Sequence, residues 1–288
     1  MTYLTKEDWE TFFVQKLCDD KSFLEYIKEK NKIQSDFIFL LQKILKTKNN
    51  YPKKIFRRVL FSSLIIFHKF ILANNITFFN LSFTEKLTIY LACIFLSFKI
   101  INKLIPVQKL SSEFQYLFND KNKMEYKIED INKLITNKEF EILFSIQFQI
   151  NLDWPYDYLN LIENYLGQIG IGKEIIKAII NFVIIKINEI ILFPLYLYYT
   201  PFELIISSLT IIKEEFKLNY IDINEFIKIN KLEIVKENIS KCSFLINKII
   251  KFKKKFHENE VNENEIANKN KEKEKINFNT LSSIQTNN

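Results

Sequence analysis

Two short segments constrain the fold most strongly, because each marks the start of a helix that must be buried. Ser82–Glu85 and Thr200–Glu203 both follow the pattern S/T-x-x-E, in which the hydroxyl accepts from a free amide and the glutamate reaches back to the first residue. The segment after each box is almost wholly apolar, and after the first it includes LTIYLACIFLSFKI. A helix that is apolar on nearly every side needs other helices around it. The two boxes therefore predict two helical bundles, each with a buried central helix.

Helical spacing of apolar residues continues on both sides of these segments. Only three glycines and five prolines occur in 288 residues, too few for the many tight turns of a β-sandwich or a doubly wound sheet. We therefore predict an all-α fold of two five-helix repeats with flanking N- and C-terminal helices, the second half starting near Pro155. The expected helices cover 6–30, 35–46, 54–73, 83–101, 107–118, 128–150, 155–166, a segment ending near 189, 201–216, 221–229 and 232–256.

The expected helices divide the chain into four parts. Residues 1–34 form an N-terminal helical extension, 35–153 a first repeat, and 154–256 a second repeat with a C-terminal helix. The tail, 257–288, includes ENEVNENEIANKNKEKEK. A segment so poor in apolar residues cannot bury enough surface to fold alone, so we expect it to be disordered.

Several classes of function are not expected from the composition. Cys18, Cys93 and Cys242 form no CxxC pair and only two histidines accompany them, so we expect no metal site and a reducing compartment. The start, MTYLTKEDWETFF, lacks the basic and apolar regions of a signal peptide, and no uncharged apolar segment is long enough to span a membrane. The glycine cluster at 167–172 does not have the spacing GxGxxG, so we expect an ordinary loop there. Without a nucleophile–base set or a phosphate loop, we expect neither catalysis nor a cofactor.

The net charge of +7 raises the question of whether the protein binds nucleic acid. A basic protein can bind a phosphate backbone. In this chain, however, lysine takes the place of arginine almost everywhere, and a diffuse positive surface accounts for the excess charge. We therefore do not expect direct binding of nucleic acid.

Four motifs, in their order along the chain, resemble the cyclin family. They are FHKFILANN at 67–75, LACIFLSFK at 91–99, WPY at 154–156 and LYYTP at 197–201. The first resembles the second-helix motif of transcription-type cyclins, the second the family's third-helix signature, and the third the junction that closes the first repeat. The fourth is similar to the corresponding step of cyclin H-type proteins. The resemblance extends over about 35–256 and implies the cyclin fold.

The adjacent residues Arg57 and Arg58 lie in FRRVL. This segment resembles the M-R-x-x-L motif that mitotic cyclins carry on their first helix. Here the order of the expected helices places it on the second helix. We therefore expect no substrate-docking patch of the mitotic kind.

The cyclin resemblance implies a kinase-binding surface at the end of the third helix. It places Lys99 and Glu139 in hydrogen bonds with the backbone of a kinase's regulatory helix, beside an apolar patch. A cation is favoured at the last turn of a helix, and a charge held against an apolar surface suits a partner that supplies acceptors. Two alternatives stay open: Lys99 simply extends to water, or Glu139 belongs to a local capping box that begins at Thr136. The implied apolar contacts are Leu96, Ile100, Leu143, Phe148 and Ile150.

The function implied by the resemblance is that of a non-catalytic subunit that activates a cyclin-dependent protein kinase. The cyclin H type serves a CDK-activating kinase and the transcription factor complex TFIIH, often with a RING-type assembly factor. We accordingly expect a role in transcription and the cell cycle, and localisation in the nucleus or, as second choice, the cytoplasm. The alternatives are a cyclin of the C, K, L or T type, a DNA-binding transcription factor of the TFIIB kind, and a helical scaffold without a kinase.

Overall fold

The computed structural model describes residues 20–46, 52–74, 80–122, 125–150, 152–191, 193–232, 234–251 and 253–254. Within these ranges all regular secondary structure is helical, which confirms the all-α prediction. Residues 1–246 form one compact unit and 247–288 another. The expected disorder of 257–288, and the part of the first expected helix before residue 20, lie outside the described residues.

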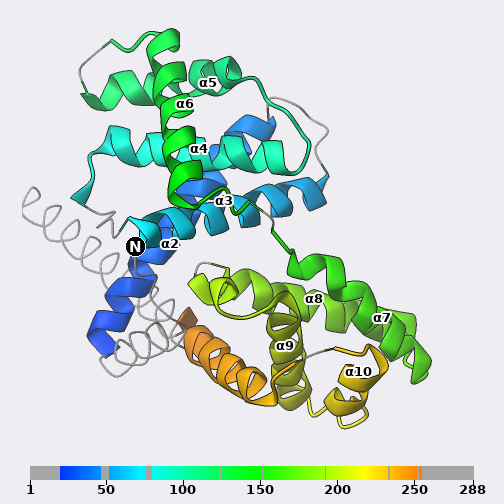
Figure 1. Ribbon diagram of the computed structural model, residues 1–288. Helices are drawn as coiled ribbons and strands as arrows, with labels where there is room; N and C mark the ends of the chain where they lie inside the picture. Colours follow the sequence, from blue (N-terminus) through cyan, green and yellow to red (C-terminus); the bar gives the residue numbers. More distant parts are fainter. Residues whose placement is uncertain are drawn as a thin grey trace, which may run out of the picture. The chain divides into compact units, whose positions relative to one another are not determined.

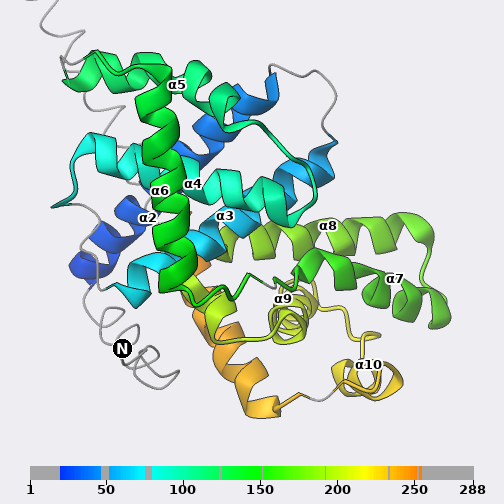
Figure 2. The ribbon, with the colours of Figure 1, turned by 45° about the horizontal axis from the view of Figure 1, so that its top comes forward.

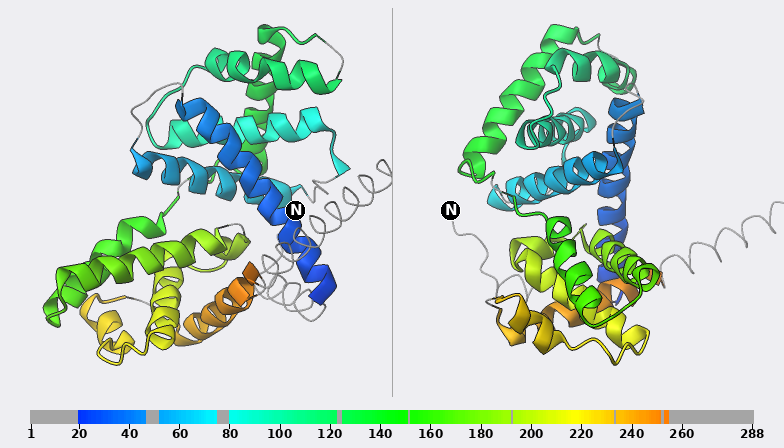
Figure 3. Two further views of the ribbon diagram at one scale, coloured as in Figure 1. Left: turned by 180° about the vertical axis from the view of Figure 1, so that it is seen from behind. Right: turned by 90° about the vertical axis from the view of Figure 1, so that its right-hand side faces the viewer.

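In the first set of described helices, four surround a central one, α4. Figure 1 shows α4 between α5 and α3 with α6 crossing in front, and the view from behind in Figure 3 shows α2 crossing the opposite side. Every residue of α4 from Leu87 to Phe98 is buried, as the apolar sequence predicts. The elements are α2 (Asp20–Lys46), α3 (Lys53–Ala73), α4 (Phe83–Ile100), α5 (Val107–Asn122) and α6 (Ile128–Ser145).

The capping box that starts α4 is formed as predicted. The amide of Glu85 donates to Ser82 Oγ over 3.3 Å, and the amide of Ser82 donates to Glu85 Oε2 over 2.9 Å. Inside the helix, the hydroxyl of Ser97 donates to the carbonyl of Cys93 and accepts from Ser63 on α3. Buried hydroxyls that are satisfied in this way do not weaken a core, so α4 tolerates a serine at its centre.

The second set repeats this plan around α9. Its capping box joins Thr200 and Glu203 with proline at the first helical position, and nearly all of the helix from Glu203 to Ile212 is buried. Figure 2 shows α7 and α8 side by side, with α9 viewed nearly along its axis. The elements are η2 (Pro155–Tyr158), α7 (Leu159–Gln168), α8 (Lys173–Ile190), η3 (Pro194–Leu197), α9 (Pro201–Glu215), α10 (Ile223–Ile229) and a last helix that begins at 236.

Among the described residues the helices thus fall into two sets of five, consistent with the predicted two-repeat cyclin fold. The expected loop lies between α7 and α8, where Gly170 has a φ of 81° and Gly172 is the N-cap of α8, but Gly167 belongs to the last turn of α7. No helix in the described ranges is long and apolar enough to cross a bilayer.

The largest differences from the predicted helix boundaries are in α2 and α6. The helix expected over 35–46 begins at Asp20, because no glycine or proline interrupts the chain there and buried Ile33 and Phe37 continue one apolar face. The helix expected over 128–150 ends at Ser145. Gln147 and Phe148 then adopt φ values of 52° and 57°. Apolar spacing cannot predict this left-handed turn, since neither residue is a glycine.

Candidate functional site

Lys99 and Glu139 form an ion pair between the last turn of α4 and the middle of α6. Lys99 Nζ lies 2.5 Å from Glu139 Oε1 and 4.2 Å from the centre of the Phe95 ring. The Glu139 side chain is only 7% exposed, whereas that of Lys99 is 41% exposed. The buried carboxylate and the Phe95 ring therefore hold the ammonium group on one side, and its other side faces water.

The structure also tests the two alternatives that the sequence left open, a capping box from Thr136 to Glu139 and a Lys99 that simply extends to water. Thr136 lies inside α6, and its hydroxyl donates to the carbonyl of Asn132 over 2.8 Å. Glu139 is therefore not part of a capping box. Lys99 reaches water, but it does so while bonded to a carboxylate from another helix, so it is not simply an extended surface lysine.

The apolar residues expected around the pair do not all reach the surface. Leu96 is buried in the core, so it supports α4 from beneath and presents no accessible side chain. Ile100, Leu143 and Ile150 are half-buried, and Phe148 is exposed. The structure therefore places four of the five expected apolar residues where a partner could contact them.

The sequence interpretation missed two exposed phenylalanines on α6. Phe140, Phe144 and Phe148, here called the phenylalanine row, follow one another at intervals of four residues, and Phe144 is 68% exposed. The rings of Phe144 and Phe148 pack edge to face with their centres 5.3 Å apart. Large apolar side chains that gather on a surface commonly mark an interaction site. The i, i+4 spacing was the signal that could have identified this row.

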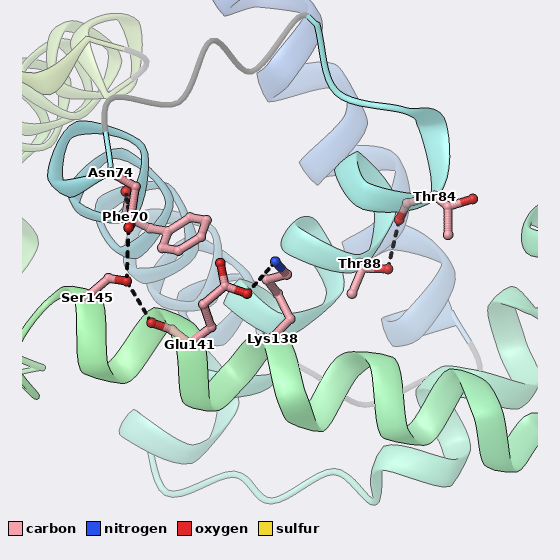
Figure 4. A network of polar contacts seen from close by, with 7 residues as sticks. All are labelled: Phe70, Asn74, Thr84, Thr88, Lys138, Glu141 and Ser145. Atoms are coloured by element: carbon pink, nitrogen blue, oxygen red, sulfur yellow. Dashed lines mark hydrogen bonds and ion pairs between the residues drawn. The ribbon is translucent and has the colours of Figure 1, made fainter.

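Polar contacts hold the end of α6 against the end of α3 (Figure 4). The hydroxyl of Ser145 donates to the carbonyl of Glu141 and lies 3.4 Å from Asn74 Oδ1, while the Asn74 amide donates to the carbonyl of Phe70. Lys138 Nζ lies 2.5 Å from Glu141 Oε2 and 5.9 Å from the centre of the Phe70 ring. These contacts fix the C-terminal half of α6, which carries Phe140 and Phe144 and leads into the turn that holds Phe148.

A buried histidine connects α3 with η3. The hydroxyl of Tyr196 donates to the carbonyl of Leu64 over 3.0 Å and also contacts His68 Nδ1. Because the single hydroxyl hydrogen cannot serve both acceptors, we assign a proton to His68 Nδ1, which then donates to the Tyr196 oxygen. Burial, assisted by the charge of Lys30, holds the pKa of His68 well below 6.5. Among the described residues the ring contacts Tyr196 and Phe67, which is a packing role between α3 and η3. Within the described residues no group of three or more His, Cys, Asp or Glu side chains could hold a metal ion.

Comparison with known proteins gave structural similarity alone. No family model matches the sequence, and no curated protein matches it. A chain of the yeast TFIIK (Kin28/Ccl1/Tfb3) complex is similar with a TM-score of 0.47 and 18% identity, over 81% of this chain and 93% of that one. A chain of the CAK complex from Chaetomium thermophilum bound to ATP-gamma-S has a TM-score of 0.46 and 14% identity, over 77% and 64% of the two chains.

Proposed function

We propose that this chain is the non-catalytic regulatory subunit of a cyclin-dependent protein kinase. The observation that carries the proposal is the ion pair of Lys99 and Glu139, which lies at the end of a buried central helix beside an exposed apolar row. The resemblance of LACIFLSFK and the other three motifs to cyclins, which first pointed to Lys99 and Glu139, supports the proposal from the sequence. The two sets of five helices support a division into two repeats, which we propose to cover 35–153 and 154–256, although α2 of the first set begins earlier, at Asp20.

The proposed contact uses the part of Lys99 that Glu139 leaves free. An ammonium group has three donors, and the observed bond to Glu139 uses one. The remaining donors suit backbone carbonyls at the end of a partner helix, where the negative end of the helix dipole attracts a cation. Because Glu139 already fixes the lysine, little side-chain entropy is lost when the partner binds.

The apolar part of the proposed contact consists of residues beside the pair. Covering an exposed phenylalanine removes apolar surface from water, which contributes roughly 25 cal/mol for each Å² buried. Leu96 belongs to the proposal only as core support. The residues proposed to contact the kinase directly are Lys99, Ile100, Leu143, Phe144, Phe148 and Ile150, with Glu139 positioning Lys99.

Binding of this kind would act by positioning the kinase's regulatory helix. In protein kinases that helix must be placed correctly for a lysine–glutamate pair to form and for the activation segment to be ordered. ATP and the chemistry of phosphoryl transfer would belong to the partner.

The proposed subtype is cyclin H, and it rests on LYYTP at 197–201. The partners would then be the catalytic subunit of a CDK-activating kinase and a RING-type assembly factor, in the TFIIH context, with nuclear localisation. A C-, K-, L- or T-type cyclin is the nearest alternative.

The test is co-purification from native cells with a kinase assay on each sample. The double variant Lys99→Ala/Glu139→Ala removes both charges and leaves none unpaired. Its matched control is Lys177→Ala/Glu174→Ala, which removes an exposed pair on α8 whose atoms lie 2.8 Å apart. We expect the wild type and the control to recover an active kinase, and the Lys99 variant to lose it.

Other results would contradict parts of the proposal. Equal kinase recovery with all three proteins would place the interface elsewhere on the chain. If the wild type recovers no kinase at all, the regulatory function is wrong. Salt-sensitive retention on DNA in that case would favour the TFIIB-like alternative, and its absence the scaffold.

A further inference from the structure

Arginine is almost absent from this chain, and its location is therefore informative. Of 41 lysine and arginine residues only Arg57 and Arg58 are arginine, and both lie near the start of α3. Lysine and arginine carry the same charge, but only arginine offers a planar fork of donors that fits the oxygens of a phosphate. A position that retains arginine in so lysine-rich a chain suggests a need for that fork.

Both arginines line a surface cavity of about 280 Å³. Lys54 contributes a third cation from the first turn of α3. An adjoining cavity of about 330 Å³ shares Arg57 and Tyr156, so these two side chains form the boundary between the cavities. The remaining residues that line the smaller cavity are Tyr156 of η2, Leu159 of α7 and Ile184 of α8.

Arg58 has partners within the fold. Its guanidinium donates to the carboxylate of Asp157 and lies over the Trp154 ring, 4.7 Å from the ring centre. Its Nε atom is buried and has no partner among the described residues. Arg58 is therefore held in one orientation, with its charge largely balanced by Asp157 and one donor still unused.

Arg57 and Lys54 have no such partner. Both side chains are exposed, and neither makes a hydrogen bond or an ion pair with any described residue. They are three positions apart on α3, so they share one face of the helix. Pro52 provides no side-chain cap, and the first turn of α3 contains no acidic residue, so the positive end of the helix dipole adds to their field. The cavity therefore has unbalanced positive charge.

We propose that this cavity, the Arg57 cavity, binds a single phosphate group carried by a phosphorylated serine or threonine of a partner protein. A phosphomonoester is close to doubly negative at neutral pH, which matches the two unpaired cations. Its organic part would contact the ring of Tyr156 and the side chains of Leu159 and Ile184. This site lies on α3 and does not depend on the proposed kinase contact at α4 and α6.

An acidic residue beside the Arg57 cavity argues against nucleic acid as the ligand. Asp157 is exposed and accepts from Arg58, which lines the cavity. A nucleic acid presents successive phosphates, and the neighbours of the bound one would approach this carboxylate. A protein segment with one phosphate avoids that repulsion.

Calorimetric titration of the full chain tests the proposal with three probes: N-acetyl-phosphoserine amide, N-acetyl-serine amide and inorganic phosphate. We expect saturable binding of the phosphoserine probe, at least tenfold tighter than that of inorganic phosphate, and none of the serine probe. Loss of one charge-assisted contact in Arg57→Gln should weaken binding about 10- to 100-fold. Arg57→Lys, which keeps the charge but not the fork, should fall between.

The control is Lys133→Gln, which removes an exposed lysine from α6 and should bind as the wild type does. Both substituted side chains are exposed, and circular dichroism will verify that each variant is folded. Equal affinity of Arg57→Gln and the wild type would overturn the proposal, as would inorganic phosphate that binds as tightly as the phosphoserine probe. If Lys133→Gln weakens binding as much as Arg57→Gln, the effect is one of net charge and the cavity is not the site.

Discussion

The two central helices begin alike and end with opposite arrangements of charge. Lys99 at the end of α4 is the exposed member of its pair, and the carboxylate of Glu139 is buried. At the end of α9 the exposed member is Glu215, and it lies 2.6 Å from Lys186 of α8, whose side chain is only 10% exposed. The first set therefore exposes the donor of its pair at the surface, and the second exposes the acceptor. One scaffold can thus carry two surfaces of different specificity.

The helix dipole makes the second arrangement the less favourable one. A cation at a helix C-terminus is stabilised by the dipole, whereas an anion is not. Glu215 is the last residue of α9, so it depends on Lys186 more than Lys99 depends on Glu139. The helix dipole alone therefore favours Lys99 at the end of α4, whereas Glu215 at the end of α9 needs the cation of a neighbouring helix.

The largest expected effect tests whether the two central helices are equivalent in the core. Leu91 of α4 and Leu209 of α9 are both fully buried. Leu91→Ala and Leu209→Ala should each lower the free energy of unfolding by about 2–5 kcal/mol, since each leaves a cavity. Denaturant unfolding measures both. A loss below ~1 kcal/mol at one site only would show that the two cores are not equally packed.

The next effect concerns the ion pairs. Lys99→Ala leaves the buried carboxylate of Glu139 unpaired, which should cost about 1–3 kcal/mol of unfolding free energy. Glu139→Gln leaves only an exposed ammonium group and should cost less. In the second set the buried member of the pair is the lysine. Glu215→Ala, which leaves Lys186 unpaired, should therefore cost more than Lys186→Met. Urea titrations of the four variants check this order, and equal losses within each pair would refute it.

A smaller, pH-dependent effect comes from His68, which joins the two sets through Tyr196. Burial lowers the pKa of His68 in the folded protein, so the unfolded chain binds the proton more readily. Stability should therefore fall as the pH drops below about 6.5, by at most about 1.4 kcal/mol per pH unit. Unfolding free energies measured from pH 8 to pH 5 should show this slope in the wild type. A His68→Gln variant with the same slope would assign it to other groups.

The smallest effect compares the caps. Ser82→Ala and Thr200→Ala should each cost about 0.5–2 kcal/mol. The second should be the larger, because Glu203 is buried and also accepts from Asn238 over 2.6 Å, whereas Glu85 is exposed. Thermal unfolding of the two variants gives the order. A larger loss for Ser82→Ala would mean that the contact with Asn238 does not stabilise the second box.

The candidate site could be predicted from the sequence only in part. The resemblance to cyclins identified Lys99 and Glu139, and the structure brings them together. It also led us to expect Leu96 on the surface, although that residue lies on the inner side of α4. Phe144 was missed because an apolar residue on an amphipathic helix is normally assigned to the core.

The sequence by itself determined the class of fold, the two capped central helices and most helix positions. These features depend on contacts between residues at most four positions apart, such as Ser82 with Glu85, so the local pattern contains them. Only the tertiary structure decided which charges meet, because Lys99 and Glu139 are separated by 40 positions and pair only through the packing of α4 against α6. It also decided the end of α6 and the exposure of Phe144 and Phe148. A left-handed turn without glycine and the exposed side of a helix both depend on what the rest of the chain covers.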